Sequence, residues 1–119
     1  MSGFDEYSEE QFCYLTTRGR LTGRPHEIEI WFVVREGIAY LMSGGGRRSD
    51  WVRNLLADEK VIFRVGDTSR AARAYTPQQD DGSIRRQMAA KYQGWEEGRA
   101  LSEWAETALI VAVAAVVGN

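Results

Sequence analysis

Two short turns, each between two β-rich segments, constrain the fold of this chain more than any other sequence feature. Arg35-Glu36-Gly37 separates residues 26–34 from residues 38–42, and Gly66–Ser69 separates residues 61–65 from residues 70–75. Connections this short leave no room for a crossover helix, so the strands on either side must be antiparallel. The sequence therefore predicts a sheet with an antiparallel core.

The segment from His26 to Val34 is the clearest strand, and we expect it to run without interruption. Alternate residues of a strand point to opposite faces of its sheet. One face is predicted to hold Ile28, Ile30, Phe32 and Val34, and the other Glu27, Glu29, Trp31 and Val33. Further strands are expected at residues 12–17, 38–42, 61–65, 70–75 and 109–117, and the strongly apolar character of the last indicates burial.

Three short helices are expected between these strands. The first covers about residues 49–57, with a capping side chain at its start. The second starts at Pro77 or, because Gly82 weakens a helix, nearer Ser83, and a third carries Trp104. This order of elements predicts an α+β fold, a small β-barrel of about six mainly antiparallel strands flanked by short helices.

Composition narrows the class of protein. With 119 residues and no linker or repeat, residues 1–119 are expected to form a single domain. The net charge of −2 disfavours a general nucleic-acid binder, which is usually strongly basic. The polar N-terminus does not resemble a signal peptide, and the apolar run at residues 108–117 is too short to span a membrane. We therefore expect a cytoplasmic protein without a stable membrane anchor.

The chain has one cysteine, Cys13, and one histidine, His26. A single cysteine allows no intramolecular disulfide and is typical of a reducing compartment. One cysteine and one histidine do not make a zinc site of the usual type, so no metal site is expected. A catalytic Cys13–His26 pair is disfavoured as well.

A basic turn lies between the first two strands, where Arg18, Arg20 and Arg24 are interleaved with Gly19 and Gly23. Guanidinium groups bind phosphate or carboxylate through paired hydrogen bonds, and glycines let the backbone approach a ligand closely. The turn therefore indicates an anion site. A solvated basic hairpin is the alternative interpretation.

A second candidate segment begins with Ser43-Gly44-Gly45-Gly46 and continues through Arg47 and Arg48 to the start of a helix. A helix N-terminus carries partial positive charge and free N–H groups, which favour a bound anion. The glycines resemble part of a dinucleotide-binding fingerprint, but Ser49 stands where its third glycine belongs. A flexible loop that leads into a capped helix is the alternative.

Aromatic residues form a third group, whereas residues suited to acid–base chemistry are few. Tyr92, Trp95 and Trp104 fall on neighbouring short helices and can either cover a ring-shaped ligand or pack in the core. Glu27 and Glu29 share one face of a strand, and nothing in the sequence marks them as an acid and a base. A hydride-transfer enzyme can work without such groups, because its cofactor carries the chemistry.

Two stretches resemble the signatures of the deazaflavin-dependent nitroreductase family. The first is LTTRGRLTGRP at residues 15–25, and the second is SGGG at residues 43–46 followed by DWVRNL at residues 50–55. The resemblance extends over residues 15–116. It implies a split β-barrel like that of pyridoxamine-phosphate oxidases, with the deazaflavin coenzyme F420 in a groove.

The resemblance also implies an activity and roles for particular residues. The protein would be an oxidoreductase that passes a hydride from reduced F420 to an electron-poor acceptor such as a quinone, a nitroaromatic or an enone. Tyr92 is the candidate catalytic residue, as a proton donor on the substrate side. The residues expected to line the phosphate and acidic tail of F420 are Arg20, Thr22, Gly23 and His26, and those expected near its ring are Ser43, Gly44, Gly45, Gly46, Trp51 and Asn54. Arg24 and Arg47 are also expected to bind the cofactor.

This sequence departs from the family pattern at several positions. The family often has Thr, a basic residue and Arg where this chain has Arg18, Leu21 and His26, which alters the expected contacts to the tail. Residues 27–30, EIEI, replace a segment that often holds proline. We therefore expect the substrate pocket to differ from that of other members.

Other interpretations remain open from the sequence alone. An FMN-binding oxidoreductase of the same fold would need fewer arginines, and a non-catalytic protein could bind F420 or haem without any electron acceptor. A Rossmann-like NAD protein would use the glycine loop instead. The expected partners are a small-molecule electron acceptor, which the sequence does not identify, and a second copy of the chain in a homodimer paired through a sheet face.

Overall fold

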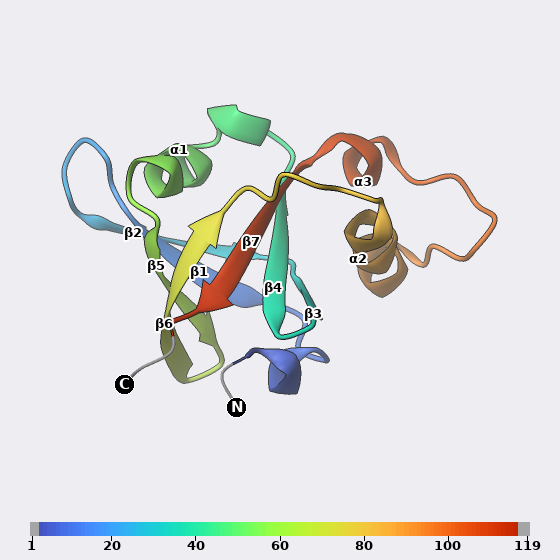
Figure 1. Cartoon of the computed structure of the whole chain (residues 1–119), viewed down its shortest axis with the longest axis horizontal. Helices are drawn as coiled ribbons and strands as arrows, with labels where there is room; N and C mark the ends of the chain where they lie inside the picture. The colour runs from blue at the N-terminus through green and yellow to red at the C-terminus, as the bar shows by residue number, and fades with distance from the viewer. Residues whose placement is uncertain (1–2, 117–119) are drawn as a thin grey trace.

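The computed structural model describes residues 3–116, and within them seven strands form one sheet in which every pairing is antiparallel. The strand order is β2-β1-β5-β6-β7-β4-β3 (Figure 1). The α+β class and the antiparallel core are confirmed, and the Rossmann alternative is excluded because it requires parallel strands. The strands are β1 (Cys13–Arg18), β2 (Pro25–Ile30), β3 (Val33–Arg35), β4 (Ile38–Ser43), β5 (Lys60–Val65), β6 (Thr68–Tyr75) and β7 (Leu109–Ala115).

The sheet curls into a half-barrel because the chain itself joins its two edges. Strands β2 and β3 lie at opposite ends of the strand order, yet only Trp31 and Phe32 separate them in the sequence. In Figure 1 this segment runs behind the other strands from β2 to β3. The main hydrophobic core fills the inside of the curl and includes Phe4, Leu15, Phe32, Leu41, Phe63 and Val111.

The prediction of one uninterrupted strand from His26 to Val34 is wrong. The pairing with β1 ends at Ile30 and a different pairing, with β4, begins at Val33. At the bend, the Phe32 N–H donates to the Tyr92 hydroxyl (3.1 Å), and the Phe32 carbonyl accepts from Lys91 Nζ (2.9 Å). A strand can leave its ladder where other groups satisfy its backbone, and here residues of a distant helix do so.

The predicted faces of this segment nevertheless hold through the bend. Phe32 and Val34 are buried in the main core, against which Ile28 and Ile30 pack. Trp31 belongs to a second cluster, which lies under the helices near the C-terminus. That second cluster contains Val33, Met42, Ile84, Met88, Ala108 and Ile110, with Trp31, Tyr40, Tyr92 and Trp104 packed against it.

Three α-helices flank the sheet as expected. They are α1 (Asp50–Ala57), α2 (Ser83–Gln93) and α3 (Glu103–Thr107), of which α2 and α3 lie together on one side of the sheet and α1 on the other (Figure 1). The chain also contains two short 3-10 helices, η1 (Asp5–Tyr7) before β1 and η2 (Gly46–Arg48) between β4 and α1. Helix α2 takes the later of its two predicted starts, because Gly82 adopts a left-handed conformation with φ of 85°.

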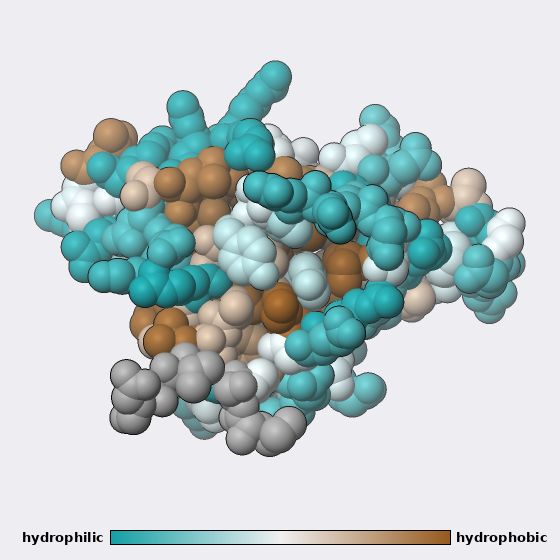
Figure 2. Space-filling model, viewed as in Figure 1, coloured by the Kyte–Doolittle hydropathy of each residue, from teal (hydrophilic) through white to brown (hydrophobic). Residues whose placement is uncertain are grey.

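On the surface seen in the same view, hydrophobic residues gather mainly in the middle, over the sheet, and hydrophilic residues cover much of the rest (Figure 2). None of the helices within residues 3–116 has the length and hydrophobicity that a membrane-spanning helix needs. The expected end of the last strand at Val117 lies outside the described residues.

Candidate functional site

The two candidate segments found in the sequence meet at Asn54, a residue of α1 whose side chain is only 3% exposed. Its amide Nδ2 donates to Thr17 Oγ1 on β1 (3.1 Å). Its Oδ1 accepts from the backbone N–H (3.2 Å) and from Nη1 (2.8 Å) of Arg20 in the basic turn. Asn54 thus fixes the basic turn to the helix that follows the glycine loop.

Arg20 is committed to this junction. Besides its bonds to Asn54, its Nη2 forms an ion pair with Asp50 at the start of α1 (3.2 Å). The guanidinium therefore braces the turn against the helix, and its charge is partly balanced by a carboxylate. Whether it also contacts an anionic ligand, as the family resemblance implies, stays a prediction.

The basic turn is closed on itself by short backbone bonds. The Gly19 N–H donates to the Arg24 carbonyl (2.7 Å), and the Gly23 N–H donates to the Gly19 carbonyl (2.8 Å). A Cβ on Gly19 would lie 2.7 Å from Nε2 of His26, so the histidine ring packs directly on this glycine. Thr22 Oγ1 accepts from the Arg24 N–H (3.2 Å), which gives Thr22 a part in shaping the turn.

Ser43 connects the start of the glycine loop to its end through hydrogen bonds of its hydroxyl. Its side chain is 3% exposed, and its Oγ donates to the Gly46 carbonyl (3.1 Å) and lies 2.7 Å from Ser49 Oγ. A Cβ on Gly45 would lie 2.6 Å from Ser49 Oγ, and Gly46 has a φ of 61°, so both positions suit glycine. These contacts define the path of the loop in the structure, and the interpretation as a flexible loop stays an alternative.

The side-chain cap expected at the start of α1 is missing. Ser49 occupies the N-cap position, but its side chain makes no hydrogen bond to the first turn of the helix, because it is engaged with Ser43. N–H groups at the start of a helix that lack such a cap are open to an external acceptor.

Four exposed arginines lie on the segments that meet at Asn54: one in the basic turn, two in η2 and one on α1. The guanidinium groups of Arg24, Arg47, Arg48 and Arg53 make no hydrogen bond or ion pair with any residue in the range 3–116. Unlike Arg20, they are available to an anionic ligand. The turn, the glycine loop and these arginines together form a basic surface that suits a phosphate or several carboxylates.

A shallow aromatic hollow of about 340 Å³ lies beside the glycine loop. Trp31 and Trp104 form two of its walls, with their ring centroids 5.6 Å apart and their planes at 88°. A Cβ on Gly44 would lie 3.2 Å from Cδ1 of Trp104, so loop and hollow are in contact. The residues that line the hollow are Phe12, Glu29, Ile30, Trp31, Met42 and Trp104.

Tyr92, the predicted catalytic residue, lies behind the hollow. Its ring stacks on Trp31 at a centroid distance of 4.4 Å and an angle of 2°. Its hydroxyl accepts from the Phe32 N–H and lies 2.8 Å from the Gln11 carbonyl and 2.9 Å from that of Phe32. Burial raises the pKa of Tyr92 to about 12, so the hydroxyl stays protonated at neutral pH. Its role as a proton donor stays a prediction.

Glu29 also lines the hollow, although no role was predicted for it. Its carboxylate Oε1 accepts from the Tyr14 hydroxyl (2.5 Å) on the neighbouring strand. The alternation of the segment 26–34 already placed Glu29 and Trp31 on the same face. What the sequence could not indicate is that Met42 and Trp104 come to the same place.

The other aromatic candidates for ligand binding differ in where the structure places them. Tyr92 and Trp104 both contact Trp31 and pack against the second hydrophobic cluster, as the core interpretation expects. Trp95 does not belong to this group and donates its Nε1–H to the Arg99 carbonyl (2.7 Å). Trp51 is half-buried and packs against the main core, so its cofactor role stays a prediction.

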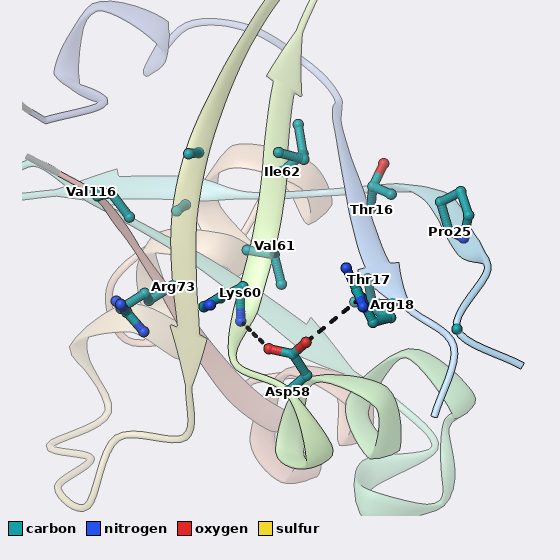
Figure 3. Close-up of a pocket in the computed structure, with 13 residues that line it drawn as sticks. Thr16, Thr17, Arg18, Pro25, Asp58, Lys60, Val61, Ile62, Arg73 and Val116 are labelled. Atoms are coloured by element: carbon teal, nitrogen blue, oxygen red, sulfur yellow. Dashed lines mark hydrogen bonds and ion pairs between the residues drawn. The ribbon is translucent and has the colours of Figure 1, made fainter. Parts of the chain in front are cut away.

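A groove of about 600 Å³ lies on the outer face of β1, β5 and β6, and Gly23 is the one predicted site residue in its lining. Figure 3 shows Asp58 at one end between Arg18 and Lys60; it pairs with Arg18 (3.8 Å) and accepts from the Lys60 backbone N–H (3.1 Å). The groove is thus separate from the hollow beside the glycine loop.

A catalytic Cys13–His26 pair is ruled out by strand register. Cys13 lies opposite Ile30 and His26 opposite Thr17, so the two side chains are well separated along the ladder. Burial raises the pKa of the Cys13 thiol, which makes it a poor nucleophile.

The fold and the site define a split-barrel protein that can hold an elongated ligand, planar at one end and anionic at the other. The uncapped helix start and the exposed arginines suit the anionic end, and the aromatic hollow beside closely packed glycines suits the ring. These features fit a deazaflavin cofactor with a phosphate and a carboxylate tail.

Comparison with known proteins identifies the family. The sequence model of the F420H(2)-dependent quinone reductase family matches residues 5–115, and the chain belongs to this family. It is therefore an F420-dependent reductase, as the resemblance implied. No curated protein sequence matches the chain.

Solved structures share the fold at low sequence identity. An F420 reductase is similar with a TM-score of 0.67 and 16% identity, over 98% of this chain and 96% of the other. HutZ, the haem storage protein of Vibrio cholerae, has a TM-score of 0.70 and 15% identity, over 96% and 88%. A candidate pyridoxamine 5'-phosphate oxidase of Listeria innocua has a TM-score of 0.61 and 17% identity, over 91% and 84%. The split-barrel prediction is confirmed.

Proposed function

We propose that this protein transfers a hydride from reduced F420 to a small electron-poor acceptor, with a quinone as the leading candidate and a nitroaromatic or an enone as further ones. The observation that carries the proposal is the contact between the glycine loop and the aromatic hollow, within a chain that belongs to the F420H(2)-dependent quinone reductase family. A cofactor anchored at the loop would present its ring to an acceptor in the hollow.

The anionic end of F420 would be held by the exposed arginines around the start of α1. Arg24 and Arg47 keep their predicted role, and Arg48 and Arg53 join them because they too have guanidinium groups without partners in the described chain. The N–H groups at the start of α1 would add neutral donors. Arg20 and Asn54 would act by holding the turn in place.

The ring would lie along the glycine loop. Ser43 and Ser49 fix the path of that loop, and Gly44 brings it against Trp104. When bound, reduced F420 supplies the hydride from its C5 carbon. The chain contributes position, through the walls that Trp31, Met42 and Trp104 provide.

Tyr92 would contribute chiefly by orienting Trp31, on which it stacks. A direct proton transfer from Tyr92 would require its hydroxyl to leave the carbonyl groups of Gln11 and Phe32. Solvent is the simpler source of the proton that the reduced acceptor takes up.

The test is a titration of F420 fluorescence with purified protein at low and high salt, with FMN as a parallel ligand. Micromolar or tighter F420 binding that weakens with salt is the expected result, because the anion site consists of exposed cations. A preference for FMN would favour the FMN-binding alternative, and tight F420 binding without turnover of any acceptor would favour the non-catalytic one.

Two further predictions stay proposals. We propose a homodimer that forms through the outer face of β1, β5 and β6, where the groove has an apolar lining and Ile62 is 42% exposed. Light scattering coupled to size-exclusion chromatography tests it directly. We also propose a cytoplasmic location, in line with the single, buried cysteine of the chain, Cys13.

A further inference from the structure

We propose that Glu29 sets the charge preference of the acceptor, so that the hollow takes neutral or cationic planar acceptors and rejects anionic ones. The proposal rests on the proposed function, because it assigns the aromatic hollow to the electron acceptor. It adds a residue, a chemical class of acceptor and a mechanism of selection that the family does not specify.

Glu29 is the acidic residue in the lining of the hollow, which is otherwise apolar or aromatic. It lies on β2 two residues before Trp31, and alternation places the two side chains on the same face. Met42 and Trp104 come from other elements of the chain and complete the walls. A planar molecule against the tryptophan rings would therefore lie beside the carboxylate.

The carboxylate is held in position by a neutral group. The Tyr14 hydroxyl donates to Glu29 Oε1 at 2.5 Å. This hydrogen bond raises the pKa of Tyr14, so the phenol keeps its proton and acts as the donor. The hydrogen bond thus fixes the position of the carboxylate.

The nearest cation on this face is engaged elsewhere. Arg64 lies over the Tyr14 ring, 4.0 Å from its centroid, and its Nη2 forms an ion pair with Glu27 (3.3 Å). Across residues 3–116 the structure gives Glu29 no ion pair. The two glutamates of this strand therefore differ: Glu27 is paired with Arg64, whereas Glu29 has no ion pair within the described residues and lines the hollow.

The tryptophan rings that line the hollow favour the same neutral or cationic acceptors. The faces of tryptophan rings attract cations and electron-poor rings, and they gain nothing from an anion. A carboxylate beside them repels an anionic substituent on the acceptor. Because the hollow is open to solvent, the effect is moderate, and we expect about a threefold to tenfold difference in acceptor preference.

The test compares two acceptors that share one ring system, 1,4-naphthoquinone and 1,4-naphthoquinone-2-sulfonate, with reduced F420 as the donor. The ratio of their kcat/KM values is measured for the native protein and for Glu29→Gln, which keeps the size of the side chain. We expect the substitution to shift the ratio toward the sulfonate by about threefold to tenfold. An unchanged ratio overturns the proposal.

Glu27→Gln is the matched control, because it removes the same charge from the same face, two residues away and outside the lining of the hollow. It should leave the ratio unchanged. If Glu27→Gln shifts the ratio as much as Glu29→Gln does, a general change in surface charge is the cause and the proposal is wrong. Thermal melts of both variants confirm that each is folded.

A binding measurement separates this proposal from the proposed function. Quenching of tryptophan fluorescence by each naphthoquinone, without F420, reports occupation of a hollow lined by Trp31 and Trp104. A preference for the neutral compound that Glu29→Gln abolishes would support charge selection even if turnover with F420 failed. Equal affinity of both compounds for the native protein would overturn it even if turnover succeeded.

Discussion

Replacing Asn54 by alanine should separate the basic turn from α1, and its cost can be estimated from the structure. The side chain makes one hydrogen bond to Thr17, one to the backbone of Arg20 and one to its guanidinium. Neutral hydrogen bonds contribute about 1 kcal/mol each and a bond to a charged group about 1.5 kcal/mol. The three bonds together amount to roughly 3.5 kcal/mol.

Much of this cost comes from partners that remain buried. Thr17 is 1% exposed, so its hydroxyl would lose its partner where water has little access. For a domain of this size, a loss of roughly 3.5 kcal/mol lowers the melting temperature by about 10–15 °C. The freed turn should also bind F420 about tenfold more weakly at a temperature where the variant is still folded.

Two measurements test this prediction, thermal denaturation followed by circular dichroism and F420 titration. Asn54→Asp is the matched control, because it keeps an oxygen for both bonds from Arg20 and the Thr17 hydroxyl can turn to donate to it. The aspartate variant should lose much less affinity than the alanine variant. A melting temperature within about 2 °C of the native value for Asn54→Ala would refute the reasoning.

Two other changes give distinct expected results. Tyr92→Phe keeps the stack on Trp31 but removes the hydrogen bonds of the hydroxyl at the bend. The melting temperature should therefore fall, while the F420 affinity stays within about twofold of the native value. A loss of kcat at constant acceptor KM would instead show that Tyr92 donates a proton. Because burial raises the pKa of Tyr92 above that of an unfolded tyrosine, its contribution to stability is fully present below about pH 10 and is lost as the pH rises toward 12, and urea unfolding across this range should show a smaller decline in Tyr92→Phe. Replacing Arg47 and Arg48 together by glutamine should weaken F420 binding at low salt and change it little at high salt, whereas equal losses at both salt concentrations would contradict an electrostatic role.

Much of the fold follows from local sequence signals. The short turns before Ile38 and after Val65 produce antiparallel pairs, as expected. Helix α1 starts at Asp50 and ends at Ala57, where the sequence placed it. These features depend on neighbouring residues, which is why sequence patterns predict them well.

The bend at Trp31 and Phe32 has a different origin. The alternation of residues 26–34 is that of a regular strand, and it continues through the bend. The strand leaves its ladder because Lys91 and Tyr92, about 60 positions later, satisfy the backbone of Phe32. No local pattern contains that information.

The site was predictable in its segments and less so in the roles of its residues. The two signatures do meet in space, but Arg20 is engaged by Asn54 and Asp50, while other arginines remain exposed. Ser49 bonds to Ser43 instead of capping α1. Each role depends on which side chain a residue meets across the fold, and spacing along the chain does not determine that.

The most direct test of the central claim is the oxidation of reduced F420 by 1,4-naphthoquinone under anaerobic conditions, followed by the return of the visible absorbance of the oxidised deazaflavin. The account predicts that catalytic amounts of the protein accelerate this reaction with saturation in both substrates, and that Asn54→Ala raises the KM for reduced F420 more than that for the quinone. A rate equal to that without protein, at protein concentrations that bind F420, would contradict it.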